Sequence, residues 1–133
     1  MNSVVGGVIA CLNARIRKMQ AVSALSHFYL RSVSAVPERR EARAARRQLK
    51  GFGTIISFDV RGDAPAADAV CAGLQLIQHA TSLGAVESTI ERRASIPGQE
   101  HLPPALLRLS VGIESVEDLW TDLDRALRNM PGV

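Results

Sequence analysis

The chain has 133 residues and a mass of 14.3 kDa, which is room for one domain of ordinary size. Hydrophobic residues make up 47% and charged residues 22%, so the composition excludes an intrinsically disordered protein. No apolar run approaches the roughly 20 residues of a membrane helix, and two cysteines make no disulfide framework, so we expect a cytoplasmic protein without a membrane partner.

The net charge of +3 conceals an asymmetry along the chain. Residues 1–50 carry ten Lys and Arg against two Glu, a net charge of +8, whereas residues 51–133 carry −5. The basic residues concentrate in Arg39–Arg47, inside a strongly helix-forming stretch. This segment could bind nucleic acid phosphates, or it could be a solvated helix that pairs with the acidic half of the chain. No aromatic residue interleaves with the arginines, which favours the solvated helix over nucleic acid.

The first elements in chain order are a short apolar strand over residues 4–10 and a weakly helical stretch over residues 13–29. Pro37 and Gly51 bracket the Arg-rich helix, as a first-turn proline and a terminating glycine do. The stretch Thr54–Val60 mixes β-branched, aromatic and polar residues, and this mixture predicts a strand.

A second helix is expected to begin at Asp63, whose short polar side chain suits an N-cap. Val70, Leu74 and Ile77 recur at helical spacing and would line its buried face. A turn is expected next, at residues 82–84.

The last part of the chain predicts a short strand over Ala85–Ile90, a loop with three prolines over residues 92–104, and a clear strand over residues 105–112. A final helix begins after Ser115, which resembles the first residue of a capping box. Its apolar positions follow helical spacing: Val116, Leu119, Trp120, Leu123 and Leu127. This order of elements predicts an α+β fold, a small, mostly antiparallel sheet with helices on one face.

Three segments of the chain occur in an order and spacing that point to a known family. They are Gly51–Asp59, Thr81–Ser88 and Leu107–Leu119. Together they resemble the C-terminal domain of the pyridoxal-phosphate-dependent enzymes of cysteine and methionine metabolism. This trans-sulfuration family includes cystathionine gamma-synthase and cystathionine gamma-lyase. The resemblance covers Gln48 to about Arg128, some 60% of the chain.

The resemblance implies a truncated member of the family, with the fold of the C-terminal domain of fold-type I pyridoxal-phosphate enzymes. Residues 51–133 would form the substrate-side domain. Residues 1–50 match less well and would be a remnant of the cofactor-domain end with an Arg-rich linking helix.

By this resemblance, Arg108 corresponds to the arginine that binds the substrate α-carboxylate, and Ser82 to a serine that helps to bind it. A guanidinium suits this role because it offers two parallel donors to a carboxylate. Taken without the resemblance, an ion pair of Arg108 with Glu114 or Glu87 is the simpler interpretation.

The chain departs from the family pattern at two places near this site. Thr81 stands where the lyases and synthases commonly have Glu, so it marks the position expected to set side-chain specificity. The segment Arg92–Pro97 replaces the usual Thr-His segment, so that wall of the site is expected to differ.

In the family, a lysine holds pyridoxal phosphate as a Schiff base, and the cofactor then acts as an electron sink. Lys18 and Lys50 are the two lysines of this chain, and neither has the family's lysine context. We therefore expect no catalytic or cofactor-binding residue here, and no cofactor bound by this chain alone. The histidines show no metal-ligand spacing, so no metal site is expected either.

Two functions remain open from the sequence. The first is a truncated trans-sulfuration enzyme, by resemblance a C–S lyase or gamma-replacement enzyme for cystathionine or homoserine derivatives. We do not expect it to be catalytic alone, and its partners would be an amino-acid-like small molecule, a second copy or a full-length relative. The alternative is a non-catalytic α+β binding or regulatory module, using Arg108 for an amino-acid carboxylate or Arg39–Arg47 for nucleic acid.

Overall fold

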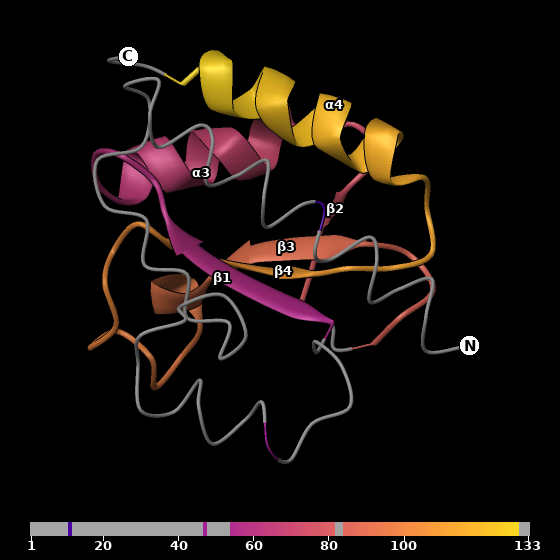
Figure 1. Cartoon of the computed structure of the whole chain (residues 1–133). Helices are drawn as coiled ribbons and strands as arrows, with labels where there is room; N and C mark the ends of the chain where they lie inside the picture. The colour runs from indigo at the N-terminus through magenta and orange to yellow at the C-terminus, as the bar shows by residue number, and fades with distance from the viewer. Residues whose placement is uncertain (1–10, 12–46, 48–53, 82–83, 131–133) are drawn as a thin grey trace.

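The computed structural model describes residues 11, 47, 54–81 and 84–130 of the chain. Within them, one layer is a four-stranded sheet and the other layer is two helices that cover one face of the sheet (Figure 1). The strands are β1 (Ile55–Asp59), β2 (Gln78–His79), β3 (Thr89–Arg92) and β4 (Leu106–Ser110). The helices are α3 (Ala64–Gly73) and α4 (Val116–Arg128), and a single 3-10 turn, η1 (Arg93–Ser95), follows β3. The α+β class is therefore confirmed.

Within the described residues the sheet is mostly antiparallel, as expected, and one parallel pair of strands makes it mixed. Its strand order is β1-β4-β3-β2, and β4 pairs antiparallel with both β1 and β3. The edge strand β2 runs parallel to β3, with Gln78 opposite Thr89. β2 was not predicted, because its two residues are both exposed and no alternation of apolar and polar residues marks it.

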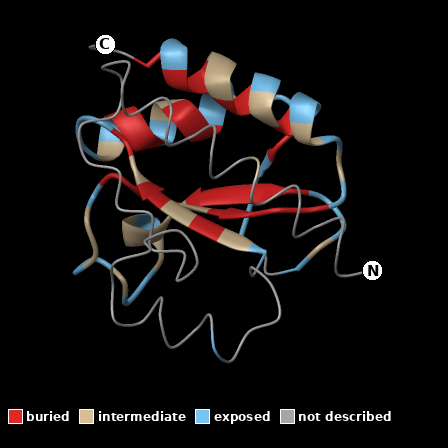
Figure 2. Cartoon of the chain, in the orientation of Figure 1, coloured by how far each residue is buried: buried red, intermediate tan, exposed pale blue. Residues whose placement is uncertain are grey.

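The core lies between the sheet and the two helices. Alternate residues of β1 and β4 point toward the helices, as the two-residue repeat of a strand requires. Figure 2 shows that the buried surfaces of the helices and the sheet face each other. The largest fully buried side chains are Ile56, Phe58, Val70, Ile90, Leu107, Leu109, Leu119, Leu123 and Leu127. Because these are mostly aliphatic, the core depends on Leu, Ile and Val rather than on aromatic rings.

Helix α3 is shorter than its apolar pattern predicts. It begins after Asp63, as expected, but it ends at Gly73, so Leu74 and Ile77 lie beyond it. The reason is a distant carboxylate. Asp122 of α4 accepts hydrogen bonds from the backbone N–H groups of residues 75, 76 and 77, at 2.9, 2.8 and 2.8 Å. Those N–H groups are thereby satisfied outside a helix, and Ile77 is still buried in the core.

The strand expected over Ala85–Ile90 begins four residues later and ends two residues later, as β3. Residues 86 and 88 make their hydrogen bonds elsewhere: Ile113 N donates to the Val86 carbonyl at 3.0 Å, and Gln78 N donates to the Ser88 carbonyl at 3.0 Å. The strand begins at Thr89, where pairing with β4 starts.

Helix α4 forms as predicted, with Leu119, Leu123 and Leu127 buried and the remaining apolar positions packed against the core. Asp63 and Ser115 both occupy N-cap positions, but neither makes a side-chain capping bond, so the capping box expected at Ser115 is wrong. Among the described residues, no helix has the length and apolar character needed to cross a membrane.

The elements expected over residues 4–10 and 13–29, and nearly all of the Arg-rich helix, lie outside the described residues. The division of the chain at residue 50 therefore stays a prediction.

Candidate functional site

The sheet face that points away from the helices carries the candidate site. In β4, Leu107 and Leu109 belong to the core, so Arg108 between them points to the opposite face. In β3, Ile90 belongs to the core and Glu91 points the other way. The register of the sheet places Glu91 of β3 directly opposite Arg108 on one side. On the other side, Ser57 of β1 lies opposite Arg108. Arg108 therefore lies at the centre of a polar sheet face and not in the apolar interior.

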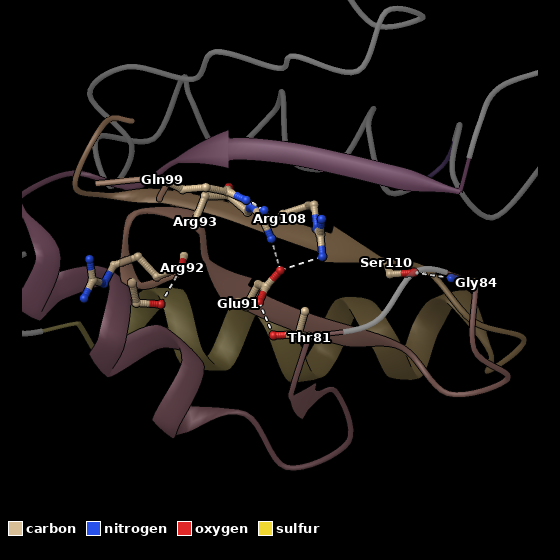
Figure 3. A network of polar contacts seen from close by, with 9 residues as sticks. Thr81, Gly84, Glu91, Arg92, Arg93, Gln99, Arg108 and Ser110 are labelled. Atoms are coloured by element: carbon tan, nitrogen blue, oxygen red, sulfur yellow. Dashed lines mark hydrogen bonds and ion pairs between the residues drawn. The ribbon is translucent and has the colours of Figure 1, made fainter. Parts of the chain in front are cut away.

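Glu91 is the centre of a polar network on this face (Figure 3). Its Oε1 accepts from Arg108 Nη2 at 2.5 Å and also from Arg93 Nη1. Its Oε2 accepts from the Thr81 hydroxyl at 2.5 Å. Arg93 in turn donates from Nη2 to the side-chain oxygen of Gln99. The Glu91 side chain is only 4% exposed, so its negative charge is compensated within the network rather than by bulk water.

Arg108 keeps a route to solvent, because its side chain is 15% exposed. Burial lowers the pKa of Arg108, the negative charge of Glu91 acts to raise it, and the positive charge of Arg93 lowers it further. A guanidinium in such a position stays charged near neutral pH. The arrangement is thus a fixed positive group at a partly open polar face, which is what binding of a carboxylate requires.

The structure places the other predicted site residues as follows. Thr81 is described and joins the network through Glu91. Ser82 lies outside the described residues. Gly84 donates its backbone N–H to the Ser110 hydroxyl at 3.2 Å, and Ser110 lies two residues after Arg108 on the same strand. The described residues on both sides of Ser82 are therefore bound to side chains that flank Arg108.

The predicted ion pair of Arg108 exists, but with a different partner. Glu114 and Glu87 were the expected partners, and this expectation is wrong. Glu114 instead accepts from the Ser88 backbone at 2.6 Å and from its hydroxyl at 2.8 Å. The Ser88 hydroxyl accepts from Gly112 N at 2.8 Å, so this group of contacts holds the ends of β3 and β4 together.

Glu91 is the site residue that sequence reasoning missed, and Arg93 was noted only as part of the segment Arg92–Pro97 that was expected to form a wall of the site. The signal that would have found Glu91 is the alternation Thr89, Ile90, Glu91, in which only the middle residue is apolar. That signal was lost because the strand was expected four residues earlier. Arg93 could not be found by alternation, since it belongs to the 3-10 turn that follows the strand.

Within the described part of the chain there is no group of three or more side chains able to hold a metal ion. His79 and His101 are both exposed, and His27 is outside the described residues. The described residues also include no lysine, since Lys18 and Lys50 both lie outside them. They therefore do not fit pyridoxal phosphate as a covalently held group.

Comparison with known proteins gives the family. The model of the Cys/Met metabolism PLP-dependent enzymes matches residues 11–128, which extends further upstream than the three motifs. Cystathionine gamma-synthase from Mycobacterium leprae is 43% identical over 107 residues, covering 72% of this chain and 28% of the relative. Cystathionine gamma-lyase from Bacillus subtilis is 44% identical over 95 residues, covering 65% of this chain and 25% of the relative.

Solved structures agree with the sequence relatives. The apo methionine gamma lyase CalE6 from Micromonospora echinospora superposes with a TM-score of 0.78 at 30% identity, covering 93% of this chain and 32% of that chain. Cystathionine gamma synthase from Xanthomonas oryzae pv. oryzae, in complex with cystathionine, gives a TM-score of 0.73 at 32% identity, covering 91% of this chain and 33% of that chain. The chain spans about a third or less of the length of these proteins, and it belongs to the family of Cys/Met metabolism PLP-dependent enzymes.

Proposed function

We propose that this chain is the substrate-side part of a trans-sulfuration enzyme and that Arg108 binds the α-carboxylate of an amino-acid substrate. The observation that carries the proposal is the place of Arg108, at the centre of the polar sheet face, held by a buried carboxylate and still partly exposed. By similarity to the relatives, the substrate would be cystathionine or a homoserine derivative, and the reaction would form or break a C–S bond.

The strand supports this role better than a loop would. Arg108 is the middle residue of β4, which is paired on both sides, so its backbone is fixed by two ladders of hydrogen bonds. A guanidinium that starts from a fixed backbone loses little further freedom when it binds a carboxylate. Glu91 holds Arg108 at Nη2 and so fixes the direction of the side chain as well.

Thr81 and Ser82 complete the proposed site. Thr81 donates its hydroxyl to Glu91, so its side chain is directed toward the same network as Arg108. We assign Ser82 as a second group for the carboxylate and Thr81 as the position that sets side-chain specificity. Both roles rest on the resemblance and on the contacts that Thr81 and Gly84 make beside Arg108.

We assign no chemical step to the described residues. In the family, pyridoxal phosphate acts as the electron sink once it is held by a lysine. Residues 54–81 and 84–130 include no lysine, so the proposal gives them substrate binding and not catalysis. A full-length relative would then supply the cofactor site, a second copy of the chain stays a predicted partner without that role, and localisation to the cytoplasm stays a prediction.

Nuclear magnetic resonance titration of the ¹⁵N-labelled chain tests the proposal. L-Methionine carries the α-carboxylate, and L-methioninamide is the same molecule with that charge removed. We expect L-methionine to shift signals of β3 and β4 and to bind at least about tenfold more tightly than the amide, because an Arg–carboxylate pair is a charge-assisted contact. Arg108→Gln should abolish the difference. Equal binding of the two ligands to the unmodified chain would refute the proposal.

A further inference from the structure

Two neighbouring arginines at the end of β3 point in different directions. Arg92 donates from Nε to Asp68 of α3 at 2.7 Å, on the helix side of the sheet. Arg93 begins the turn η1 and donates to Glu91 in the polar network (Figure 3). Exposed arginines at a turn are commonly solvated, but the Arg93 side chain is only 12% exposed. Its burial calls for a role that the proposed carboxylate site does not yet give it.

Arg93 and Arg108 share one acceptor atom. Both guanidiniums contact Oε1 of Glu91, whereas Oε2 accepts from the Thr81 hydroxyl. Gln99 accepts from the other terminal nitrogen of Arg93 and so keeps its guanidinium in place. The negative charge of Glu91 is therefore divided between two positive groups, of which Arg108 is the one proposed to bind substrate.

The sharing of the Glu91 charge between Arg93 and Arg108 affects how well Arg108 can bind a carboxylate. If Glu91 had Arg108 as its single positive partner, the two would form a complete ion pair, and Glu91 would repel a second carboxylate a few ångströms away. With Arg93 on the same oxygen, the charge of Glu91 is offset, and Glu91 can hold Arg108 without competing strongly for it.

We propose that Arg93 is a positioning residue: it neutralises Glu91, so that Arg108 remains able to bind the carboxylate of an amino-acid ligand. The proposal rests on the proposed function, since it acts through Arg108. It requires no contact between Arg93 and the ligand.

The same ¹⁵N titration with L-methionine and L-methioninamide tests this proposal on the whole chain. Arg93→Gln removes the neutralising charge and should weaken L-methionine binding about tenfold, with less than about a twofold change for L-methioninamide. Arg92→Gln is the matched control, because it removes the adjacent guanidinium that pairs with Asp68 instead. It should change neither dissociation constant by more than about twofold.

A double variant separates neutralisation from a merely structural role. If Arg93 acts by offsetting Glu91, Glu91→Gln added to Arg93→Gln should restore L-methionine binding to within about threefold of the unmodified chain. A purely structural role predicts the opposite, because two altered residues in one network would damage the site more than one. Failure of the double variant to restore binding would overturn the proposal.

Two further measurements keep the outcomes distinct. Gln99→Leu leaves every charge in place but releases Arg93, and should weaken L-methionine binding by at least about threefold; this variant decides the question if Arg93→Gln does not fold. Loss of binding in Arg108→Gln together with unchanged binding in Arg93→Gln and Gln99→Leu overturns the role of Arg93 alone. Unchanged binding in Arg108→Gln, or no binding by the unmodified chain, overturns the proposed function and this inference with it.

Discussion

Among substitutions that keep the size of the side chain, replacement of Asp122 should lower the free energy of unfolding most. Its carboxylate is 4% exposed and accepts from three successive backbone N–H groups, those of Gln75, Leu76 and Ile77. It also pairs with Arg125 one turn along α4. Asp122→Asn keeps the size of the side chain and removes its charge, so the change isolates these contacts.

The size of the effect can be worked from the contacts. A hydrogen bond to a charged group contributes about 1.5–3 kcal/mol net, and three of them end on this carboxylate. The amide oxygen of Asn still accepts one or two bonds, so we expect a loss of about 3 kcal/mol rather than the full sum. For a chain of 133 residues this corresponds to a fall in Tm of about 10 °C.

The pH dependence gives a second signature of the same carboxylate. Burial acts to raise the pKa of Asp122, but hydrogen bonds from Ile77, Gln75 and Leu76 and the charge of Arg125 outweigh it and hold the pKa below its usual value. The carboxylate therefore contributes its full stabilisation at pH values above the pKa of an unfolded Asp, about 3.9. This stabilisation is lost as the pH falls through the lower pKa of Asp122 in the folded chain. The Asn variant should lack this part of the acid-induced loss of stability.

Urea unfolding followed by circular dichroism, at pH 7 and in steps down to pH 3, measures both effects. Asp124→Asn is the matched control, because Asp124 lies on the same helix and pairs with Arg128, whose side chain is 62% exposed. That pair is open to solvent at Arg128, so it should contribute much less than the three backbone contacts of Asp122. Equal destabilisation by the two substitutions would refute the reasoning, since it would show that the three backbone contacts carry no special weight.

Three other predictions concern the packing around the site and in the core. A Cβ on Gly112 would lie 2.2 Å from the Val86 carbonyl oxygen. Gly112→Ala should therefore lower the free energy of unfolding by about 3 kcal/mol in urea titrations. A loss below about 0.5 kcal/mol, which is the error of the method, would contradict the close contact. Ser88→Ala removes the hydroxyl that Gly112 and Glu114 contact, and should cost about 2 kcal/mol by thermal unfolding, whereas Ser88→Thr, which keeps the hydroxyl, should cost less. Burial raises the pKa of Cys71 to about 11, so at pH 8 this thiol should react with Ellman's reagent only at the rate of unfolding. The variant Cys11→Ser leaves Cys71 as the single thiol, and its fast reaction in the folded chain would contradict the burial of Cys71.

Local sequence pattern predicted the parts of the fold that local physics decides. The strands β1 and β4 and the helix α4 were found because apolar residues recur at two-residue or helical spacing over five residues or more. The end of α3 was missed because it depends on Asp122, more than 40 residues away along the chain. No pattern near residue 74 reports such a contact.

The candidate site shows the same limit. The family motifs pointed to Arg108, and the strand that carries it was predicted over residues 105–112. Its partner Glu91 depended on the register between β3 and β4, and a strand placed four residues too early hid it. The contact of Arg93 with Glu91 depends on the turn geometry of η1, which sequence spacing does not predict.

The order of the strands has a consequence for how the chain acquires its fold. Among the described strands, β1 is joined to the rest of the sheet through β4 alone, and β4 is the last strand to be synthesised. Until residue 110 has left the ribosome, β1 and β3 have no shared neighbour, so the described sheet cannot form before its central strand β4 is present. Pairing of β1 with β4 must therefore close a loop of about fifty residues, which slows folding and leaves the unpaired strand edges exposed to other chains in the meantime.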